Sequence, residues 1–214
     1  MAKFISEICG LIDSYGGREL LMEALCQSTK LVAGYHANKN PVLSQRCATV
    51  SSKIAGAKAT LRLIDDLPVF QYTLNYGLGE CEPDRMTALL GVMSNVVDVI
   101  FYPIETICWL AEHKVFDVRN KDTWRYVKTI VCVISVYLNL VRTLRSFSLN
   151  RGNLNRQDVV TLARISLELV HAISILPIGY LWSGKLSTFQ SGFIGTLSAV
   201  LGIYQILAKG RLAK

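Results

Sequence analysis

Apolar residues recur at intervals of three and four along most of this chain, and no stretch alternates strictly between apolar and polar positions. Intervals of three to four match the turn of an α-helix, whereas strict alternation is typical of a half-buried strand. The sequence therefore predicts an all-α fold, with Gly16 and Gly17 breaking the chain between the first two helices. The expected helices cover residues 4–13, 18–35, 42–76, 86–112, 126–144, 158–176 and 186–207.

Three of these expected helices are long and strongly apolar. Residues 186–207 contain no charged residue, which makes them the strongest transmembrane candidate, because a span needs about 20 apolar residues. Residues 126–144 follow Trp124 and Arg125, which are typical of a membrane interface. Residues 86–112 are long enough but carry two acids, which are costly in lipid unless paired. We therefore predict a helical membrane protein with amphipathic interfacial helices and about two transmembrane helices in its C-terminal half.

The expected helix over residues 42–76 carries a narrow apolar seam flanked by cations. The apolar positions are spaced alternately by four and three, and no acidic residue occurs from position 42 to position 64. Cations on both sides of an apolar stripe suit a helix that lies in the plane of the lipid headgroups. The predicted membrane-binding residues are Leu43, Arg46, Cys47, Val50, Lys53, Ile54, Ala57, Lys58, Leu61, Arg62 and Ile64.

The same seam fits a second interpretation, a bundle helix whose apolar side faces other helices, since a four-three pattern is also what a bundle core requires. Its small residues Cys47 and Ala57 offer less apolar surface than a strongly inserting helix would carry. Each missing methylene forfeits about 0.8 kcal/mol of burial, so insertion by a single copy is expected to be weak and to depend on oligomers.

Small residues recur at intervals of four in the last predicted helix. This spacing lets two helix backbones approach closely in lipid, so it predicts either self-association or packing within the chain. The predicted helix-packing residues are Ser191, Gly195, Ala199, Ser198 and Gly202.

Composition supports a membrane location. Of the 214 residues, 51% are hydrophobic and only 18% are charged, and mean hydropathy is +0.33. The net charge of +7 lies in the C-terminal part, where residues 125–214 hold 11 basic and 2 acidic residues. Because these bases bracket apolar runs and accompany no nucleic-acid-binding motif, we expect anionic phospholipids as the partner and no nucleic acid.

Catalytic chemistry is not expected. The six cysteines never form a CxxC pair and the three histidines are scattered, so the sequence predicts neither a metal site nor a cofactor. Asp98 and Glu105 lie seven residues apart on one helical side, where they could act as an acid–base pair or form ion pairs inside a bundle. No nucleophile or glycine-rich phosphate loop accompanies them, so we expect no enzyme and no catalytic residues.

The chain is expected to form four regions. An amphipathic helical region covers residues 1–82, apolar helices including a membrane span cover residues 83–145, a polar linker covers residues 146–157, and the last helices with the main transmembrane segment cover residues 158–214.

Several segments together resemble the peroxin-eleven family, most closely its gamma-type branch. The N-terminal likeness lies in Tyr15-Gly16-Gly17-Arg18-Glu19 and in Leu61-Arg62-Leu63-Ile64-Asp65-Asp66-Leu67. Further matches are Tyr72-Thr73, Tyr76-Gly77-Leu78-Gly79, Asn95, Asp98, Tyr102-Pro103, Glu105, Trp109, Gly192-Phe193-Ile194-Gly195-Thr196-Leu197-Ser198 and Tyr204-Gln205. The likeness therefore runs nearly from end to end.

The resemblance implies a peroxisomal membrane protein that inserts an amphipathic helix, elongates the membrane and promotes peroxisome proliferation and division. It also implies association with itself and other family members, and recruitment of a fission adaptor and a dynamin-type GTPase. The alternative function is a pore for small metabolites, lined by Asp98, Glu105 and Glu168. The family's usual topology places both termini in the cytosol, so two spans would put the basic loop around residues 151–164 in the peroxisomal matrix. The positive-inside rule would instead keep this loop in the cytosol, so the number of spans stays open.

Overall fold

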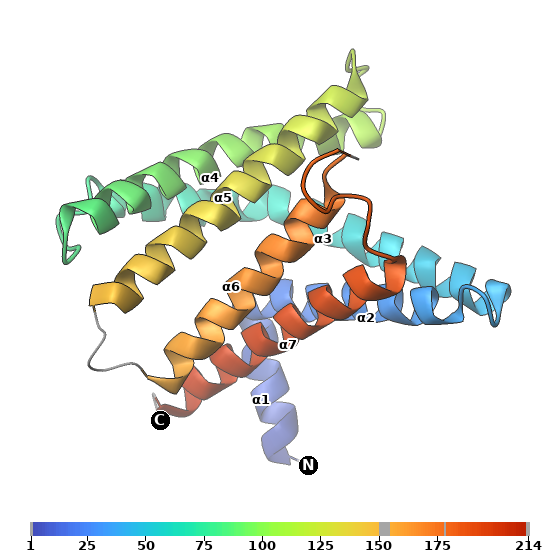
Figure 1. The fold of residues 1–214 in the computed structure, drawn as a ribbon, viewed down its shortest axis with the longest axis horizontal. Coiled ribbons are helices and arrows are strands. Elements are labelled where there is room, and N and C mark those ends of the chain that lie inside the picture. Colours follow the sequence, from blue (N-terminus) through green and yellow to red (C-terminus); the bar gives the residue numbers. More distant parts are fainter. Residues whose placement is uncertain (1, 150–154, 178, 213–214) are drawn as a thin grey trace. The chain divides into compact units, whose positions relative to one another are not determined.

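The computed structural model describes residues 2–149, 155–177 and 179–212, with side chains described for residues 8–63, 69–149, 155–177 and 179–208. Within these ranges the chain forms seven helices and no strand, which confirms the predicted all-α fold (Figure 1). The helices are α1 (Ala2–Asp13), α2 (Tyr15–His36), α3 (Pro41–Tyr76), α4 (Arg85–Glu112), α5 (Lys121–Leu149), α6 (Arg156–Ile175) and α7 (Thr188–Leu212).

The chain divides into two compact units. Unit 1 consists of Met1–Lys58, Asn155–His171 and Lys185–Lys214, and unit 2 consists of Ala59–Leu154 and Ala172–Gly184. Each unit thus combines segments that are distant in sequence. Both ends of the expected linker at residues 146–157 are helical, since α5 continues to Leu149 and α6 begins at Arg156. Residues 150–154 lie outside the described part of the chain.

The predicted break at Gly16 and Gly17 is wrong. Helix α2 begins at Tyr15, and Ser14 is its N-cap, whose hydroxyl accepts a hydrogen bond from the Gly17 amide at 3.1 Å. A Cβ at position 17 would lie 2.0 Å from the Leu11 carbonyl oxygen, so glycine is needed there for the close approach of α1. The chain therefore turns at Ser14.

Helices α2 and α7 lie side by side in unit 1 and run antiparallel (Figure 1). A Cβ at Gly34 would lie 2.4 Å from the Phe189 amide nitrogen, and one at Gly192 would lie 2.6 Å from the Leu31 amide nitrogen. Glycine at these positions allows the two backbones to approach closely along their length.

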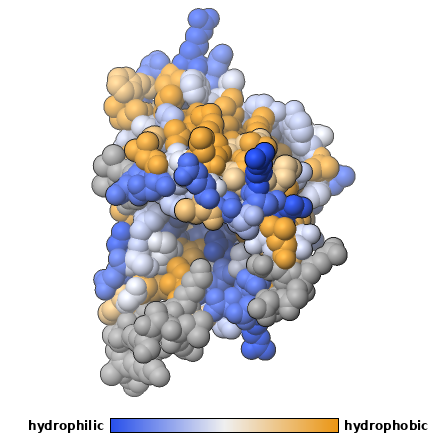
Figure 2. All heavy atoms as spheres, turned by 90° about the vertical axis from the view of Figure 1, so that its left-hand side faces the viewer, coloured by the Kyte–Doolittle hydropathy of each residue, from blue (hydrophilic) through white to orange (hydrophobic). Residues whose placement is uncertain are grey.

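In unit 2, α4 and α5 form an antiparallel helical hairpin (Figure 1). Asp84 caps α4, and Pro103 lies inside it. Apolar side chains reach the molecular surface in broad patches, coloured orange in Figure 2, and 33 large hydrophobic residues are exposed among those whose side chains the structure describes. Such an extent of apolar surface is typical of proteins that contact membranes or other proteins.

Candidate membrane-active surface

The side of α3 that faces α2 in unit 1 is polar. The Ser44 hydroxyl donates to the Ala33 carbonyl oxygen at 2.8 Å, and the Ser51 hydroxyl donates to the Cys26 carbonyl oxygen at 2.9 Å. One further heptad along, the Lys58 ammonium group pairs with Glu23 and lies 3.8 Å from a carboxylate oxygen of Glu19. Residues spaced by seven share one side of a helix, so α3 turns this polar side to α2.

The predicted apolar seam occupies a different side of α3. In unit 1, Leu43, Val50 and Ala57 are exposed, and Cys47 and Ile54 are half-buried. In unit 2, Leu61 is 45% exposed, and Ile64 lies outside the residues with described side chains. The seam therefore lies beside the polar contact with α2 and keeps much of its surface open.

The four predicted cations of α3 fall into two groups. Arg46 and Lys53 are exposed. Lys58 is held by Glu23, and in unit 2 the Arg62 guanidinium group lies 3.4 Å from a carboxylate oxygen of Glu105. Paired cations are less available to lipid phosphates, so Arg46 and Lys53 form the accessible basic side.

The predicted helix-packing residues of α7 are all buried. The Ser191 hydroxyl accepts a hydrogen bond from Lys30 of α2 at 3.1 Å, and the Ser198 hydroxyl donates to Glu168 of α6 at 3.3 Å. A Cβ at Gly195 would lie 2.6 Å from the Gln27 side chain, and one at Gly202 would lie 2.8 Å from that of Leu20. Ala199 is only 2% exposed. This side of α7 thus contacts α2 and α6 of the same chain.

Asp98 and Glu105 are both engaged within unit 2. The Asp98 carboxylate accepts a hydrogen bond from the Ser135 hydroxyl of α5 at 2.6 Å. Glu105 is 7% exposed, and its carboxylate lies 3.4 Å from Arg62 and 3.8 Å from the Lys128 ammonium group. Glu105 therefore joins α3, α4 and α5 through ion pairs, as the bundle interpretation predicts, whereas Asp98 is held by a hydroxyl group of α5.

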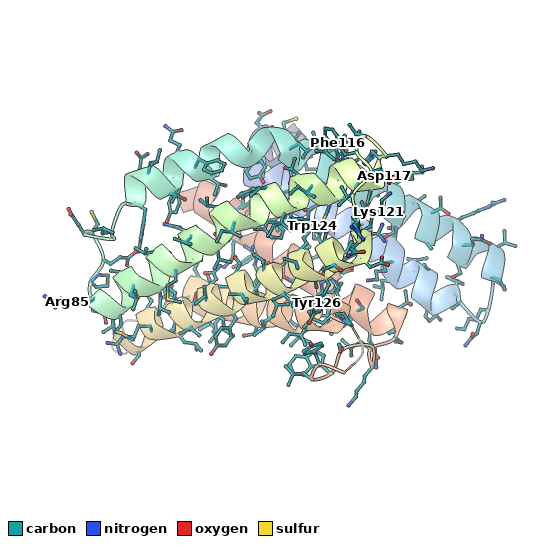
Figure 3. The ribbon with its side chains drawn as sticks, turned by 90° about the horizontal axis from the view of Figure 1, so that it is seen from above. Arg85, Phe116, Asp117, Lys121, Trp124 and Tyr126 are labelled. Carbon is teal, nitrogen blue, oxygen red and sulfur yellow. The ribbon has the colours of Figure 1, made fainter. Side chains whose placement is uncertain are left out.

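Polar and aromatic residues mark both ends of the α4–α5 hairpin. Figure 3 shows Phe116, Asp117, Lys121, Trp124 and Tyr126 gathered at one end and Arg85 at the opposite end. Such residues anchor helices at the two faces of a bilayer, where aromatic rings and long cationic side chains meet headgroups. The hairpin thus has the anchors of a membrane-inserted pair.

The end of the hairpin near the start of α4 is also fixed by ion pairs. Asp84 accepts hydrogen bonds from the Thr87 hydroxyl, from the Thr87 amide at 3.0 Å and from Arg145 at 2.8 Å. These contacts lower the pKa of Asp84 to about 2, with the Thr87 hydroxyl as the largest cause and Arg145 next. Glu82 pairs with Arg142 in the same region.

Three helices of the described chain are long and apolar enough to cross a membrane, by length and composition: residues 85–112, 121–149 and 188–208. They coincide with α4, α5 and most of α7. Two of the three lie in the C-terminal half, as predicted. In the described part of the chain, no cluster of three histidine, cysteine or acidic side chains is placed to hold a metal ion.

Comparison with known proteins decides the family. Residues 5–158 match the model of the family described as Peroxisomal biogenesis factor 11 (PEX11). The chain belongs to this family. It is therefore a peroxisomal membrane protein of the PEX11 family, with a role in peroxisome biogenesis and proliferation, and no enzymatic activity is known for the family.

Two relatives match over nearly their whole length. Peroxisomal membrane protein 11C of Homo sapiens is 28% identical over 235 aligned residues, covering 98% of this chain and 97% of that protein. The Mus musculus protein of the same name is 29% identical with the same coverage. These relatives confirm the expected likeness to the gamma-type branch. No solved structure matches the chain.

Proposed function

We propose that this PEX11-family protein shapes and elongates the peroxisomal membrane, and so promotes peroxisome proliferation and division, by inserting the apolar seam of α3 into one leaflet. One observation carries the proposal: the seam is open on a side of α3 that does not face α2, and it lies next to the exposed cations Arg46 and Lys53.

Insertion of this seam is energetically modest for one copy. Fully burying a Val or Leu side chain contributes about 1.5–3 kcal/mol, and Leu43, Val50 and Leu61 are only partly exposed before insertion. Attraction of Arg46 and Lys53 to anionic headgroups adds about 1 kcal/mol per cation. Several copies acting on one membrane patch would combine these terms, and a helix wedged between headgroups on one side expands that leaflet and bends the membrane.

Association with further copies and family members, and recruitment of a fission adaptor and a dynamin-type GTPase, complete the proposal. We assign the small residues of α7 a different task, the packing of α7 against α2 and α6, because they are buried there. Self-association would then use another surface of the chain.

A metabolite pore is the second candidate, and the geometry favours it less. Of its three proposed lining acids, Asp98 accepts a hydrogen bond from Ser135, Glu105 pairs with Arg62 and Lys128, and Glu168 pairs with Arg164 at 2.8 Å. Acids that already have ion-pair or hydrogen-bond partners are poorly placed to line a water-filled path.

The test is tubulation by the full-length protein reconstituted in vesicles that contain anionic phospholipid. The double variant Arg46→Glu/Lys53→Glu removes the accessible cations and should lose most tubules, while thermal unfolding stays unchanged because both side chains are exposed. The charge-keeping control Arg46→Lys/Lys53→Arg should tubulate like the parent. A second control, Lys114→Glu/Arg119→Glu, makes the same change in net charge at exposed positions of the α4–α5 turn. Full tubulation by the α3 charge-reversal variant would refute insertion through this surface.

A further inference from the structure

We propose that α2 and α6, besides α7, place their outward sides in the hydrocarbon of the membrane, so that these three helices form a lipid-embedded bundle with polar contacts between them. The partner of these outward sides is the acyl-chain region of the bilayer. The inference concerns different surfaces from the α3 seam and does not depend on α3 insertion.

Helix α2 turns apolar residues outward. Leu25, Val32 and Tyr35 are spaced by seven and three, so they share one side of the helix, to which the half-buried Leu21 and Ser28 also belong. Leu25 is 51% exposed, Val32 is 41% exposed and Tyr35 is 53% exposed. A helix on the surface of a water-soluble bundle presents its charged side outward, and α2 does the opposite.

The polar residues of α2 point into unit 1. Glu23 receives a hydrogen bond from Gln27 at 2.7 Å and pairs with Lys58 of α3. Gln27 is 6% exposed, and Lys30 reaches Ser191 of α7. Each ionised group of this side thus meets a polar or charged partner between helices, which is the arrangement that tolerates charge at membrane depth.

Helix α6 has the same inverted arrangement. Its Arg164 pairs with Glu168, and the Thr161 hydroxyl accepts a hydrogen bond from Gln205 of α7 at 2.6 Å. On its outward side, Val159 is 57% exposed and Ala163 is also exposed. Arg164, Glu168 and Thr161 of α6 therefore meet partners within the helix or on α7, while Val159 and Ala163 are exposed.

The outward side of α7 continues these apolar surfaces. Its polar and small residues face α2 and α6, and its large apolar residues face outward at intervals of four, four, three and four. Because α7 is long and apolar enough to enter a membrane and α2 and α6 flank it, their outward sides meet the same surroundings. The exposed residues of α7 are Phe189, Phe193, Leu197, Val200 and Tyr204.

Exposed charges of these three helices lie at helix ends. Arg18 and Arg156 lie in the first turns of α2 and α6, and Lys39 and Lys185 lie in flanking turns. Up to residue 208, no described residue in the middle of α2, α6 or α7 is both charged and exposed. The cations at these ends can therefore lie at headgroup depth, while the apolar sides between them meet the acyl chains.

The test measures where individual side chains lie in the full-length, membrane-reconstituted protein. A p-acetylphenylalanine residue is placed singly at Val32, Ala163, Val200 or Thr49 and coupled to a nitroxide, which leaves the native cysteines unchanged. Collisions with oxygen, which concentrates in hydrocarbon, are compared with collisions with a water-soluble nickel complex by electron paramagnetic resonance. Val200 is the lipid reference, and Thr49 on the Arg46 and Lys53 side of α3 is the water reference.

Labels at Val32 and Ala163 are expected to match Val200, with an oxygen-to-nickel collision ratio several-fold above that at Thr49. A ratio equal to that at Thr49 would place these sides in water and overturn the proposal. Protection from both reagents would show that a second copy or another protein covers them, and would overturn it equally. If the label at Val32 disturbs the helical circular dichroism, Leu25 on the same side of α2 replaces it.

Discussion

Units 1 and 2 both hold acids and bases between their helices, but they differ in how the helices carry them. In unit 2, α4 and α5 are apolar over long windows, and single acids such as Glu105 are neutralised by neighbouring cations. In unit 1, α2 and α6 carry charged residues along much of their length and turn them inward. Whether a helix can face lipid therefore depends on its outward half and not on its average composition.

Average hydropathy selects α4, α5 and α7 as candidate spans and leaves out α2 and α6. Mean hydropathy does not indicate the apolar outward side of α2, because charged residues such as Glu23 and Lys30 lower the mean although they face the interior of unit 1. A helix whose polar side is satisfied by its neighbours can meet lipid with the other side. We therefore expect unit 2 to respond most to the loss of a charge between its helices, and unit 1 to respond to a charge added on its outward sides.

The largest expected effect is in unit 2, from Glu105→Leu. Removing the acid leaves Arg62 and Lys128 facing each other across α4 without a counter-charge. Breaking a largely buried ion pair in this way costs about 3–5 kcal/mol. At about 2–4 °C per kcal/mol for a chain of this size, the melting temperature in detergent should fall by roughly 10 °C.

Two further variants separate this ion-pair effect from a general effect of the substitution. Glu112→Leu removes an acid that pairs with Arg125 at an exposed site, where the cost is about 1 kcal/mol or less. The triple change Glu105→Leu/Arg62→Leu/Lys128→Met removes all three charges and should recover most of the lost stability. A Glu105→Leu protein that melts like Glu112→Leu would show that the ion pairs of unit 2 are not needed.

The second effect probes the outward side of unit 1 with Val32→Asp. If Val32 meets hydrocarbon, a carboxylate there costs about 2.5–3.5 kcal/mol. The fraction of the protein that resists alkaline extraction from membranes should fall clearly. Thr49→Asp is the matched control at an exposed position of α3, and it should leave that fraction unchanged. Equal extraction of the two variants would contradict the proposal that Val32 of α2 meets hydrocarbon.

The sequence was sufficient for the helices and the apolar spans. The expected spans at residues 126–144 and 186–207 correspond to α5 and α7, and the long apolar candidate at residues 86–112 corresponds to α4. Runs of apolar residues can be recognised without knowing which helices they contact. The predicted start of α2 is wrong because two adjacent glycines do not by themselves end a helix. Their effect depends on Ser14, which caps the helix, and on the close approach of Gly17 to Leu11.

The candidate surface shows the same limit. The seam and its cations are visible as a pattern, but the division of the cations into exposed and paired groups is not. Glu23 is 35 positions from Lys58, and Glu105 is 43 positions from Arg62, so only the folded chain reveals these partners. Likewise, the small residues of α7 predict a close contact with another helix, but they do not indicate that this helix is α2.

The smallest of the three effects concerns the contact that keeps the polar side of α2 inward. Gly192→Val adds a side chain whose Cβ would lie 2.6 Å from the Leu31 amide nitrogen, and such overpacking costs about 1–3 kcal/mol. The melting temperature should fall by a few degrees at about 2–4 °C per kcal/mol. Gly56→Val makes the same exchange where a new Cβ meets no atom within 4 Å, and it should melt near the parent. Equal melting of both variants would mean that α2 and α7 are not closely packed, and the inward-facing polar side of unit 1 would lose its main support.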